Sequence, residues 1–540
     1  MALEPVLVPP HRDAMVRGGY WRDRTLDDWL ADAVAHRPDH EAVVAYRRDR
    51  DEPVRLGYAE LDHLVDAAAH AFTRRGVEPG DVVAYQLPNW WELVVISLAC
   101  ARIGAVAGPL MPIFRQRELR FMLGLAEAKV LIVPTVFRGF DHAAMAHELA
   151  RSLDHPMTVL TVGDRDDGGT SWLTGEGDDP AGPPPPGRLG PDDVALLMYT
   201  SGTTGEPKGV MHTSNTLLSG AYAFAERMGL DGGSVVLGAS PMAHLTGYGY
   251  LVGLPIVLGA TTVCLDQWDP ARALGIVAAE GITFSMASSP FVADLCAAAE
   301  AGAPVSDDFA RFVCAGAPIP PVLIERAHRV LGLTVCSAWG MTENGAATLT
   351  EPDRAAEKSA TSDGRPMPGM ELRVVGAGGE PLPAGTTGSL QVRGPQQFAG
   401  YLHRPQLNAT DTDGWFTTGD LAFLDDEGYV RIDGRTKDLI IRGGENIPVL
   451  EVEHLLYRHP AVEEVAVVGY PDERLGERAC AFVTLAPGGA FDLPELRRYL
   501  AAEQVAVQYH PERVVVIDAM PRTPSGKIQK FKLRHDAAGG

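Results

Sequence analysis

A loop rich in glycine and hydroxyl side chains follows directly after an apolar run near the middle of the chain. The apolar run covers residues 194–198 and predicts a buried strand. The loop reads Tyr199-Thr200-Ser201-Gly202-Thr203-Thr204-Gly205-Glu206-Pro207-Lys208-Gly209. Glycines let backbone N–H groups curl around phosphate oxygens, and hydroxyl groups with a lysine complete such a cradle. The sequence therefore predicts a polyphosphate-binding loop at the end of a strand.

The residues around Lys208 distinguish this loop from two common nucleotide-binding loops. A Walker A loop has glycine, lysine and then serine or threonine, so that the last hydroxyl reaches magnesium. Here Lys208 lies between Pro207 and Gly209, and the pattern of a kinase glycine loop does not match either. A solvated turn is the ordinary interpretation of such a segment, but its length and composition argue against that interpretation.

Strand-like runs alternate with helical patterns through most of the chain. This alternation predicts an α/β fold whose sheets are largely parallel and form several layers. A chain of 540 residues is too long for one core, so we expect more than one domain. Residues 164–191 are rich in Asp, Gly and Pro and predict an exposed connection. We predict strands at 82–86, 130–133, 158–162 and 235–238, and helices at 91–102 and 213–228.

A second, smaller unit is predicted toward the end of the chain. Residues 434–438 suggest a boundary, so we expect a large N-terminal domain at 1–436 and a small α+β domain at 437–540. The last segment, residues 521–530, is predicted to be a loop that presents Lys527 from a turn. Within the small domain we predict helices at 450–457 and 493–503, and strands at 462–470 and 479–485.

The charge balance narrows the range of partners. A net charge of -23 disfavours nucleic acids and anionic membrane surfaces. We therefore expect small-molecule partners, and any anionic ligand must be met by local cations.

The cysteines and the apolar segments bear on the cellular compartment. The six cysteines have no metal-ligand or CxxC spacing, which fits free thiols in a reducing compartment. The first residues lack the apolar core of a signal peptide. The best transmembrane candidate, residues 93–112, is interrupted by Arg102, Gly104 and Pro109, which favours a buried helix followed by a short strand. We expect a cytoplasmic protein without a transmembrane segment.

Four more segments carry groups that suit nucleotide chemistry. They are Ser337-Ala338-Trp339-Gly340-Met341-Thr342-Glu343-Asn344; Thr418-Gly419-Asp420; residues 434–438 with Gly443-Gly444-Glu445-Asn446; and the Lys527 loop. Together with the first loop, these segments resemble the adenylate-forming superfamily of acyl-CoA synthetases, peptide-synthetase adenylation domains and luciferases. The resemblance covers nearly the whole chain, with the segments in the expected order and spacing.

The resemblance implies an ATP site. It places the loop at the phosphates, an aromatic side chain against the adenine, and a carboxylate and an arginine at the ribose. Trp339 stands where the family most often has a tyrosine, so a contact through that hydroxyl is lost. The ATP-binding residues implied are Thr200, Ser201, Gly202, Thr203, Thr204, Gly205, Lys208, Ala315, Gly316, Ala317, Trp339, Gly340, Asp420 and Arg435.

The resemblance also implies catalytic and moving parts. Thr342 is expected to touch the adenylate phosphate, Glu343 to bind Mg²⁺, and Lys527 to catalyse the first half-reaction. Lys437 occupies the hinge position, and Gly443 and Gly444 belong to the segment that reaches the CoA channel. Singly, these residues have ordinary structural interpretations, such as a turn residue for an aspartate or a solvated cation for a lysine.

The expected chemistry follows from the charges. A carboxylate must attack the α-phosphorus of ATP although both are anions, so the site has to offset their repulsion. Pyrophosphate leaves, and a thiol then attacks the acyl-adenylate and releases AMP. ATP, Mg²⁺ and CoA are the cofactors that this reaction implies. By resemblance, the small domain swings about Lys437 between the two steps.

The segment Pro241 to Tyr250 resembles the lining of the acyl pocket. Met242, His244, Leu245 and Tyr248 are the expected pocket residues, with His244 beside the reacting carboxylate. Relatives that activate amino acids usually have an aspartate there, and residues 235–265 contain none. We therefore expect a hydrophobic acid, whether medium-chain, branched, alicyclic or aromatic. The N-terminal stretch, with Gly19-Tyr20-Trp21, resembles bacterial cyclohexanecarboxylate–CoA ligases and medium-chain synthetases.

Three functions remain open from the sequence. The leading prediction is an AMP-forming acyl-CoA ligase. An adenylating enzyme that loads the phosphopantetheine of a carrier protein is the second, because both acceptors present the same thiol arm. A non-catalytic adenylate-binding protein is the third, although the presence of Glu343, Asp420 and Lys527 argues against it.

Overall fold

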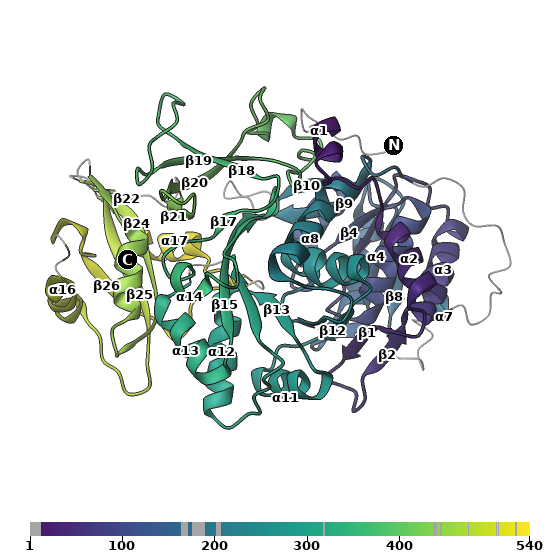
Figure 1. The fold of residues 1–540 in the computed structure, drawn as a ribbon, viewed down its shortest axis with the longest axis horizontal. Helices are drawn as coiled ribbons and strands as arrows, with labels where there is room; N and C mark the ends of the chain where they lie inside the picture. The colour runs from purple at the N-terminus through teal and green to yellow at the C-terminus, as the bar shows by residue number, and fades with distance from the viewer. Residues whose placement is uncertain are drawn as a thin grey trace.

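The structure, a computed structural model, contains a large N-terminal part and a smaller C-terminal unit, which lies at the left of Figure 1. The structure describes residues 12–163, 171–174, 189–200, 207–316, 319–435, 440–442, 445–472, 475–503, 505, 507–523 and 526–539. The predicted domain boundary, between residues 436 and 437, falls outside the described residues.

The first sheet of the large domain carries the glycine-rich loop. Its strand order is β10-β9-β4-β3-β5-β8, and all neighbours are parallel except β9 and β10. The helices that follow these strands are α4 (Trp91–Ile103), α5 (Gln116–Leu125) and α6 (His142–Ser152). The strands are β3 (Val82–Tyr85), β4 (Val106–Pro109), β5 (Val130–Pro134), β8 (Thr158–Val162), β9 (Val194–Thr200) and β10 (Lys208–Thr213).

The second sheet has the order β17-β16-β15-β14-β13-β11-β12-β1-β2. Strands β15, β14, β13, β11, β12 and β1 run parallel, so their carboxyl ends share one edge. The strands are β1 (Glu41–Tyr46), β2 (Val54–Gly57), β11 (Val235–Gly238), β12 (Thr261–Leu265), β13 (Phe284–Ala287), β14 (Arg311–Ala315), β15 (Thr334–Met341), β16 (Gly345–Leu349) and β17 (Arg365–Pro366).

Helices separate and cover the two sheets. Helix α4 contacts β4 of one sheet and β1 of the other, and α8 (Ser214–Met228) contacts β10 and β16 in the same way. Both are buried along most of their length because each faces a sheet on two sides. The remaining helices of the large domain are α1 (Arg12–Arg17), α2 (Leu26–His36), α3 (Tyr58–Arg74), α7 (Ser171–Thr174), α9 (Leu245–Gly247), the π-helix η2 (Tyr248–Gly253), α10 (Leu254–Leu258), α11 (Pro270–Glu280), α12 (Ser289–Glu300), α13 (Pro321–Leu331) and α14 (Ala355–Lys358).

An antiparallel sheet completes the large domain, and a mixed sheet forms the small one. The antiparallel sheet contains β18 (Glu371–Val375), β19 (Gly388–Arg393), β20 (Phe416–Leu424) and β21 (Val430–Arg435). The small domain has its own buried apolar clusters. Its elements are β22 (Ile440–Arg442), β23 (Glu445–Ile447), β24 (Val462–Asp472), β25 (Gly476–Leu485), β26 (Arg513–Val516), α15 (Val449–Tyr457), α16 (Leu493–Ala502) and α17 (Lys530–Gly539).

Local sequence explains how the chain turns from β10 into α8. Thr213 caps the helix, because its side chain accepts a hydrogen bond from the backbone N–H of Thr216. Gly229 ends the helix with a φ of 62°, in the left-handed region where glycine is favoured. These two residues fix where the chain leaves β10 and where α8 ends.

The predicted fold class is confirmed: a mixed α/β large domain with mostly parallel sheets is joined to a small α+β domain. The strand predicted at 158–162 is β8 and the helix predicted at 213–228 is α8, beginning one residue later. The connection predicted at 164–191 lies largely outside the described residues. Within the described part of the chain, no helix is long and apolar enough to cross a bilayer.

Candidate active site

The two ends of the glycine-rich loop are held together by strand pairing. Thr200 at the end of β9 pairs with Lys208 at the start of β10, so the loop is the tip of an antiparallel hairpin. Lys208 Nζ lies 4.5 Å from the centre of the Tyr401 ring and 3.5 Å from its hydroxyl oxygen. Residues 201–206, which include the predicted Ser201, Gly202, Thr203, Thr204 and Gly205, lie outside the described residues.

Glu343 lies in the turn between β15 and β16 and is only 5% exposed. Tyr401 donates its hydroxyl hydrogen to Glu343 Oε1, with 2.7 Å between the oxygens. Burial and the Glu343 charge raise the pKa of Tyr401, so it remains a donor. A single tyrosine therefore connects the lysine after the loop with the predicted Mg²⁺ carboxylate.

The described residues could bind a magnesium ion only if the phosphates of a nucleotide supplied further oxygen ligands. In the described part of the chain, no group of three or more His, Cys, Asp or Glu side chains could hold a metal ion. Mg²⁺ is usually bound by one or two carboxylates, with water and substrate phosphates supplying the other oxygens. One carboxylate, Glu343, beside a phosphate-binding loop matches that pattern.

Trp339 and Asp420 are joined directly. Trp339 Nε1 donates to Asp420 Oδ2 over 3.0 Å, and Asp420 is 2% exposed. The backbone N–H of Asp420 donates to Thr418 Oγ1 over 3.1 Å, which fixes the turn before the carboxylate. Arg435 pairs with Asp420 across β20 and β21. The predicted adenine and ribose residues are thus adjacent, although the Arg435 side chain is outside the described part.

Lys527 of the small domain lies against the large domain. Gly316, which follows β14, has a φ of +84°, and a Cβ atom there would lie 3.3 Å from Lys527 Cε. A Cβ atom on Gly526 would lie 2.5 Å from Ser288 Oγ. The lysine loop can therefore dock this closely because glycines occupy both sides of the contact. Gly340 lies in β15, and Ala315 ends β14, whereas Ala317 is outside the described residues.

His244 is fixed in the loop after β11. Its Nδ1 accepts a hydrogen bond of 3.2 Å from the backbone N–H of Thr246. Burial and the positive charge of Lys527 lower the pKa of His244 to about 3. The loop is anchored by Asn89, whose Oδ1 accepts from the N–H of Met242 and whose Nδ2 donates to the carbonyl of Ser240. The neutral imidazole thus lies beside the catalytic lysine predicted from the sequence.

A small cavity opens beside this loop. It measures about 20 Å³, and Leu245 is the predicted pocket residue that lines it. Tyr248 instead bonds toward Tyr85 and Ser97 in the interior, and Met242 is fully buried. The lining residues are His212, Thr216, Leu217, Gly220, Ala221, Leu245, Gly249, Tyr250, Gly345 and Gln396.

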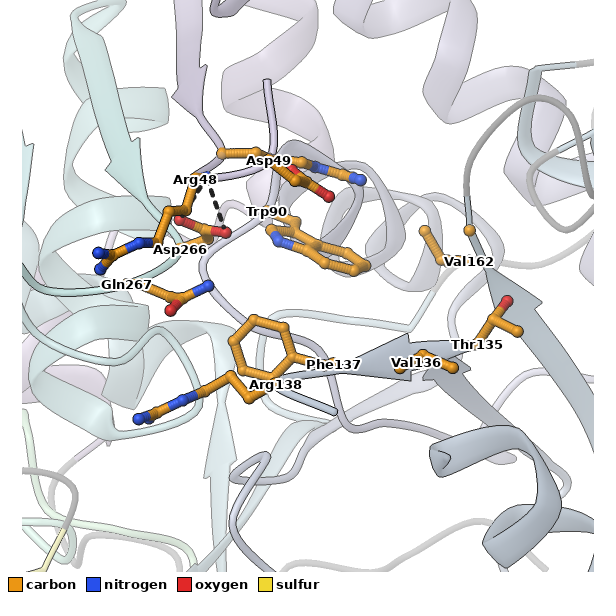
Figure 2. Close-up of a pocket in the computed structure, with 12 residues that line it drawn as sticks. Arg48, Asp49, Trp90, Thr135, Val136, Phe137, Arg138, Val162, Asp266 and Gln267 are labelled. Carbon is orange, nitrogen blue, oxygen red and sulfur yellow. Dashed lines mark hydrogen bonds between the residues drawn. The ribbon is translucent and has the colours of Figure 1, made fainter. Parts of the chain in front are cut away.

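A larger pocket of about 410 Å³ lies at the carboxyl ends of β1, β5, β8 and β12 (Figure 2). The rings of Trp90 and Phe137 meet edge to face, with 6.0 Å between centres. Figure 2 shows Arg48 and Arg138 extending toward the same side of the pocket. Asp266 lies on the rim and accepts a hydrogen bond from the backbone N–H of Arg48. Strand β12 neighbours β11, so this pocket and the His244 loop share one edge of the sheet.

Two family models match most of the chain. The family model described as AMP-binding enzyme matches residues 30–402, and the model described as AMP-binding enzyme C-terminal domain matches residues 451–527. The chain belongs to the AMP-binding enzyme family. The resemblance to adenylate-forming enzymes found in the sequence is thereby confirmed.

Relatives named as acid ligases or acid-activating enzymes are similar to this AMP-binding enzyme over nearly its whole length. The chain is 36% identical to a medium-chain fatty-acid–CoA ligase of Escherichia coli strain K12, over 97% of this chain and 92% of the relative. It is also 36% identical to a salicylyl-CoA synthase / salicylate adenylyltransferase of a Streptomyces species, over 98% and 96%. The solved structure of ATP-bound MatB from Rhodopseudomonas palustris superposes with a TM-score of 0.82 at 28% identity, covering 95% of this chain and 99% of that one.

These matches confirm the prediction that this AMP-binding enzyme is an AMP-forming acid–thiol ligase. The roles assigned to single residues, the hinge at Lys437 and the channel segment at Gly443 and Gly444 stay predictions, and the last three positions are outside the described residues. Two site residues were missed by sequence reasoning. Tyr401 and Gln396 lie in an ordinary Gly-Pro-Gln…Gly-Tyr stretch, and only packing brings them to the site.

Proposed function

We propose that this protein activates a compact hydrophobic carboxylic acid with ATP and transfers the acyl group to CoA, releasing AMP and pyrophosphate. The observation that carries this proposal is the position of Lys527. It lies against Gly316, in the predicted adenine segment, and its charge lowers the pKa of His244, in the predicted acyl segment. A lysine at that point can offset the repulsion between a substrate carboxylate and the α-phosphate.

In the first half-reaction, a carboxylate oxygen of the acid attacks the α-phosphorus and the bond to pyrophosphate breaks. We assign the Lys527 ammonium to the oxygens that gain charge, and the loop with Lys208 to the β- and γ-phosphates. Trp339 stacks on the adenine, Asp420 and Arg435 hold the ribose, and Thr342 touches the α-phosphate. When bound at Glu343, Mg²⁺ would neutralise phosphate charge, and Tyr401 would hold that carboxylate in place.

In the second half-reaction, a thiol attacks the acyl-adenylate carbonyl and AMP leaves. Because His244 Nδ1 accepts a hydrogen bond from the N–H of Thr246, the neutral ring carries its hydrogen on Nε2 and can donate a hydrogen bond there. Burial and the charge of Lys527 keep the ring neutral, since they lower its pKa to about 3. We propose that the small domain turns about Lys437, which withdraws Lys527 and brings Gly443 and Gly444 to the thiol's path.

The cavity beside His244 supports a compact acid. Its walls include Leu217, Ala221, Leu245 and Tyr250, and it contains no carboxylate to pair with a substrate amine. At about 20 Å³ the cavity has room for about one water molecule, so any acid must displace its walls, and a compact acid displaces them least. Relatives of the chain act on a medium-chain fatty acid in one case and on salicylate in another.

The pocket in Figure 2 supports free CoA as the acceptor. CoA carries an adenosine 3′,5′-bisphosphate, which a carrier protein's phosphopantetheine lacks. Arg48 and Arg138 suit its phosphates, and the partly exposed Phe137 ring suits its base. Asp49 and Asp266 also line the rim, so the pocket surface is not uniformly positive. The two guanidinium groups would therefore bind the 3′-phosphate of CoA directly.

The experiment that tests the proposal has two stages. A panel of acids is screened for acid-dependent ATP–pyrophosphate exchange, and thioester formation is then measured with CoA, dephospho-CoA and a phosphopantetheinylated carrier. We expect exchange with compact apolar acids and a thioester with CoA. Exchange followed by transfer only to the carrier would favour the carrier-loading function, and exchange with no acid would favour an adenylate-binding protein.

A substitution separates the acceptor from the rest of the reaction. Arg138→Gln should raise the KM for CoA about 5- to 10-fold and leave the KM for dephospho-CoA unchanged, since only CoA has the 3′-phosphate. Arg329→Gln, at an exposed arginine on α13, is the matched control.

The six buried free cysteines support a cytoplasmic location for this reaction.

A further inference from the structure

The side chain of Gln396 is buried without a hydrogen-bond partner. It is 1% exposed, and among the described residues neither Oε1 nor Nε2 has a donor or acceptor within reach. Buried amides are nearly always paired, so an unpaired one calls for a missing partner. Rotating the amide does not help, because both of its polar atoms lack a partner.

Two glycines leave space for this amide at the cavity. A Cβ atom on Gly345 would lie 2.6 Å from Gln396 Oε1, and one on Gly220 would lie 3.1 Å from it. Gly345 also has a φ of +61°, which glycine adopts without strain. The chain therefore leaves room for the carboxamide where any larger residue at either position would displace it.

The cavity that Gln396 lines adjoins the proposed reaction centre. Leu245, next to His244, lines it, and so does His212, whose Nε2 lies 2.6 Å from the carbonyl oxygen of Thr342. On another side, a Cβ atom on Gly249 would meet nothing within 4 Å, so open space continues there. An acid whose carboxylate lies beside His244 and Lys527 would direct its body into this space.

The other polar groups of the cavity are already paired. His212 Nδ1 lies 3.1 Å from Thr216 Oγ1, and Thr216 Oγ1 also accepts a hydrogen bond from the backbone N–H of Thr213. The hydroxyl of Tyr250 bonds with the backbone of Ala346. The remaining walls are apolar or glycine. Gln396 is therefore the lining side chain, among those described, that is left to bond with a substrate.

We propose that Gln396 is a specificity-determining residue that selects a hydroxyl-bearing acid. A hydroxyl group can accept a hydrogen bond from Nε2 and donate one to Oε1, which satisfies the amide on both sides. A plain hydrocarbon acid would leave both atoms unpaired, and sites built for a substrate hydroxyl discriminate strongly against analogues that lack it. This inference rests on the proposed acid activation and names its substrate class: a compact alicyclic or aromatic acid with a hydroxyl group away from the carboxylate.

An ordered water is the alternative partner. A space of about 20 Å³ is large enough for about one water molecule. In that case a hydroxyl group on the acid would bring no advantage, and replacing the amide would affect all acids alike.

The test compares matched acids. Cyclohexanecarboxylic acid is paired with its 3- and 4-hydroxy derivatives, and benzoic acid with the three hydroxybenzoic acids. In acid-dependent pyrophosphate exchange, we expect the wild-type kcat/KM to be about 10- to 100-fold higher for at least one hydroxylated member of a series. Equal kcat/KM values throughout both series would overturn the inference, and this measurement needs no substitution.

A Gln396 variant then tests whether the amide causes the preference for hydroxylated acids. Gln396→Met keeps the length of the side chain but removes both polar atoms, and should reduce the preference to within about twofold. Gln397→Met is the matched control, because Gln397 is also buried but bonds toward Thr410 and does not line the cavity. Equal losses for hydroxylated and plain acids in Gln396→Met would overturn the inference. Absence of exchange with every acid in the wild type would instead refute the proposed function.

Discussion

The hydroxyl of Tyr401 donates a hydrogen bond to Glu343, with 2.7 Å between Oη and Oε1. Glu343 lies in the β15–β16 turn, and Tyr401 follows β19, so the bond joins two distant parts of the large domain. Lys208, at the foot of the phosphate-binding hairpin, lies over the same tyrosine ring. One buried side chain therefore fixes both the proposed Mg²⁺ ligand and the proposed phosphate lysine.

Tyr401→Phe should weaken catalysis through Mg²⁺. Loss of an outer partner of a metal ligand typically lowers metal affinity or activity 10- to 100-fold. We expect adenylation at low Mg²⁺ to fall by about that factor and to recover partly at high Mg²⁺, as measured by pyrophosphate exchange over a Mg²⁺ titration.

Tyr429→Phe provides the control for Tyr401→Phe. Tyr429 is also buried and donates to a glutamate, Glu351, over 2.8 Å. It should leave the Mg²⁺ dependence unchanged. The same Mg²⁺ profile for Tyr401→Phe and wild type would contradict the role given to Tyr401.

Trp339→Phe should weaken ATP binding through Asp420. The variant keeps a flat ring for the adenine but removes the N–H that bonds with the buried carboxylate. A hydrogen bond to a charged group contributes about 1.5–3 kcal/mol, so we expect the KM for ATP to rise about 10-fold or more. Trp268→Phe is the control, because Trp268 makes the same kind of bond with Asp294, over 2.8 Å, on α12. An unchanged KM for ATP would contradict the proposed ribose site.

Much of the secondary structure follows from local pattern. The apolar runs at 130–133 and 235–238 are strands because both faces of a parallel sheet are covered by helices. Strand β10, at Lys208–Thr213, was not predicted, since part of it was assigned to the loop and its last residue to the next helix. Its pairing with β9 depends on the hairpin register, which no local signal in the Gly/Ser/Thr segment sets.

Gly316→Ala should impair the first half-reaction selectively. The new methyl group would be strained at a φ of +84° and would press on Lys527 Cε. Because small misplacements of catalytic groups are costly, we expect adenylate formation to fall about 10- to 100-fold, with a smaller loss in thioester formation from supplied adenylate.

Gly332→Ala separates strain from displacement of the lysine. Gly332 has a φ of +69° but open space around the added atom, so it carries the backbone strain alone. It should reduce stability slightly and leave both half-reactions near wild type. Equal effects of the two alanines on adenylate formation would mean that contact with Lys527 is unimportant.

The buried His212 should lower the free energy of unfolding as the pH falls. Burial lowers the pKa of this histidine to about 4, below the 6.5 of an unperturbed histidine. Between these pH values the unfolded chain binds a proton that the folded chain does not, so the free energy of unfolding decreases as pH falls from about 6.5 to 4. The decrease from this residue approaches about 1.4 kcal/mol per pH unit.

Denaturant unfolding at a series of pH values measures this effect. Between about pH 4 and 6.5, the slope of the unfolding free energy against pH reports the difference in bound protons between the unfolded and folded chains. His212→Gln should reduce this difference by up to one proton. His36→Gln, at an exposed histidine that ends α2, is the control and should leave the slope unchanged. An unchanged slope in His212→Gln would show that the buried imidazole does not titrate as stated.

The sequence predicts candidate site residues only where they belong to a recognisable motif. Glu343, Asp420 and Lys527 stand in recognisable segments, and the structure places Asp420 beside Trp339 and Lys527 beside Gly316. Tyr401 and Gln396 could not be found in this way. A tyrosine that holds a carboxylate and a glutamine without a partner are defined by what surrounds them in space, and that depends on packing between β15, α8 and the segment after β19.

The central claim is that Lys527 serves adenylate formation and not the thiol step. The direct measurement compares the two half-reactions in Lys527→Ala: acid-dependent pyrophosphate exchange, and conversion of supplied acyl-adenylate to acyl-CoA. Lys532→Ala, at an exposed lysine on α17, is the control. We predict that exchange falls at least about 100-fold while thioester formation stays within about threefold of wild type. Equal loss of both half-reactions, or retention of exchange, would contradict the account.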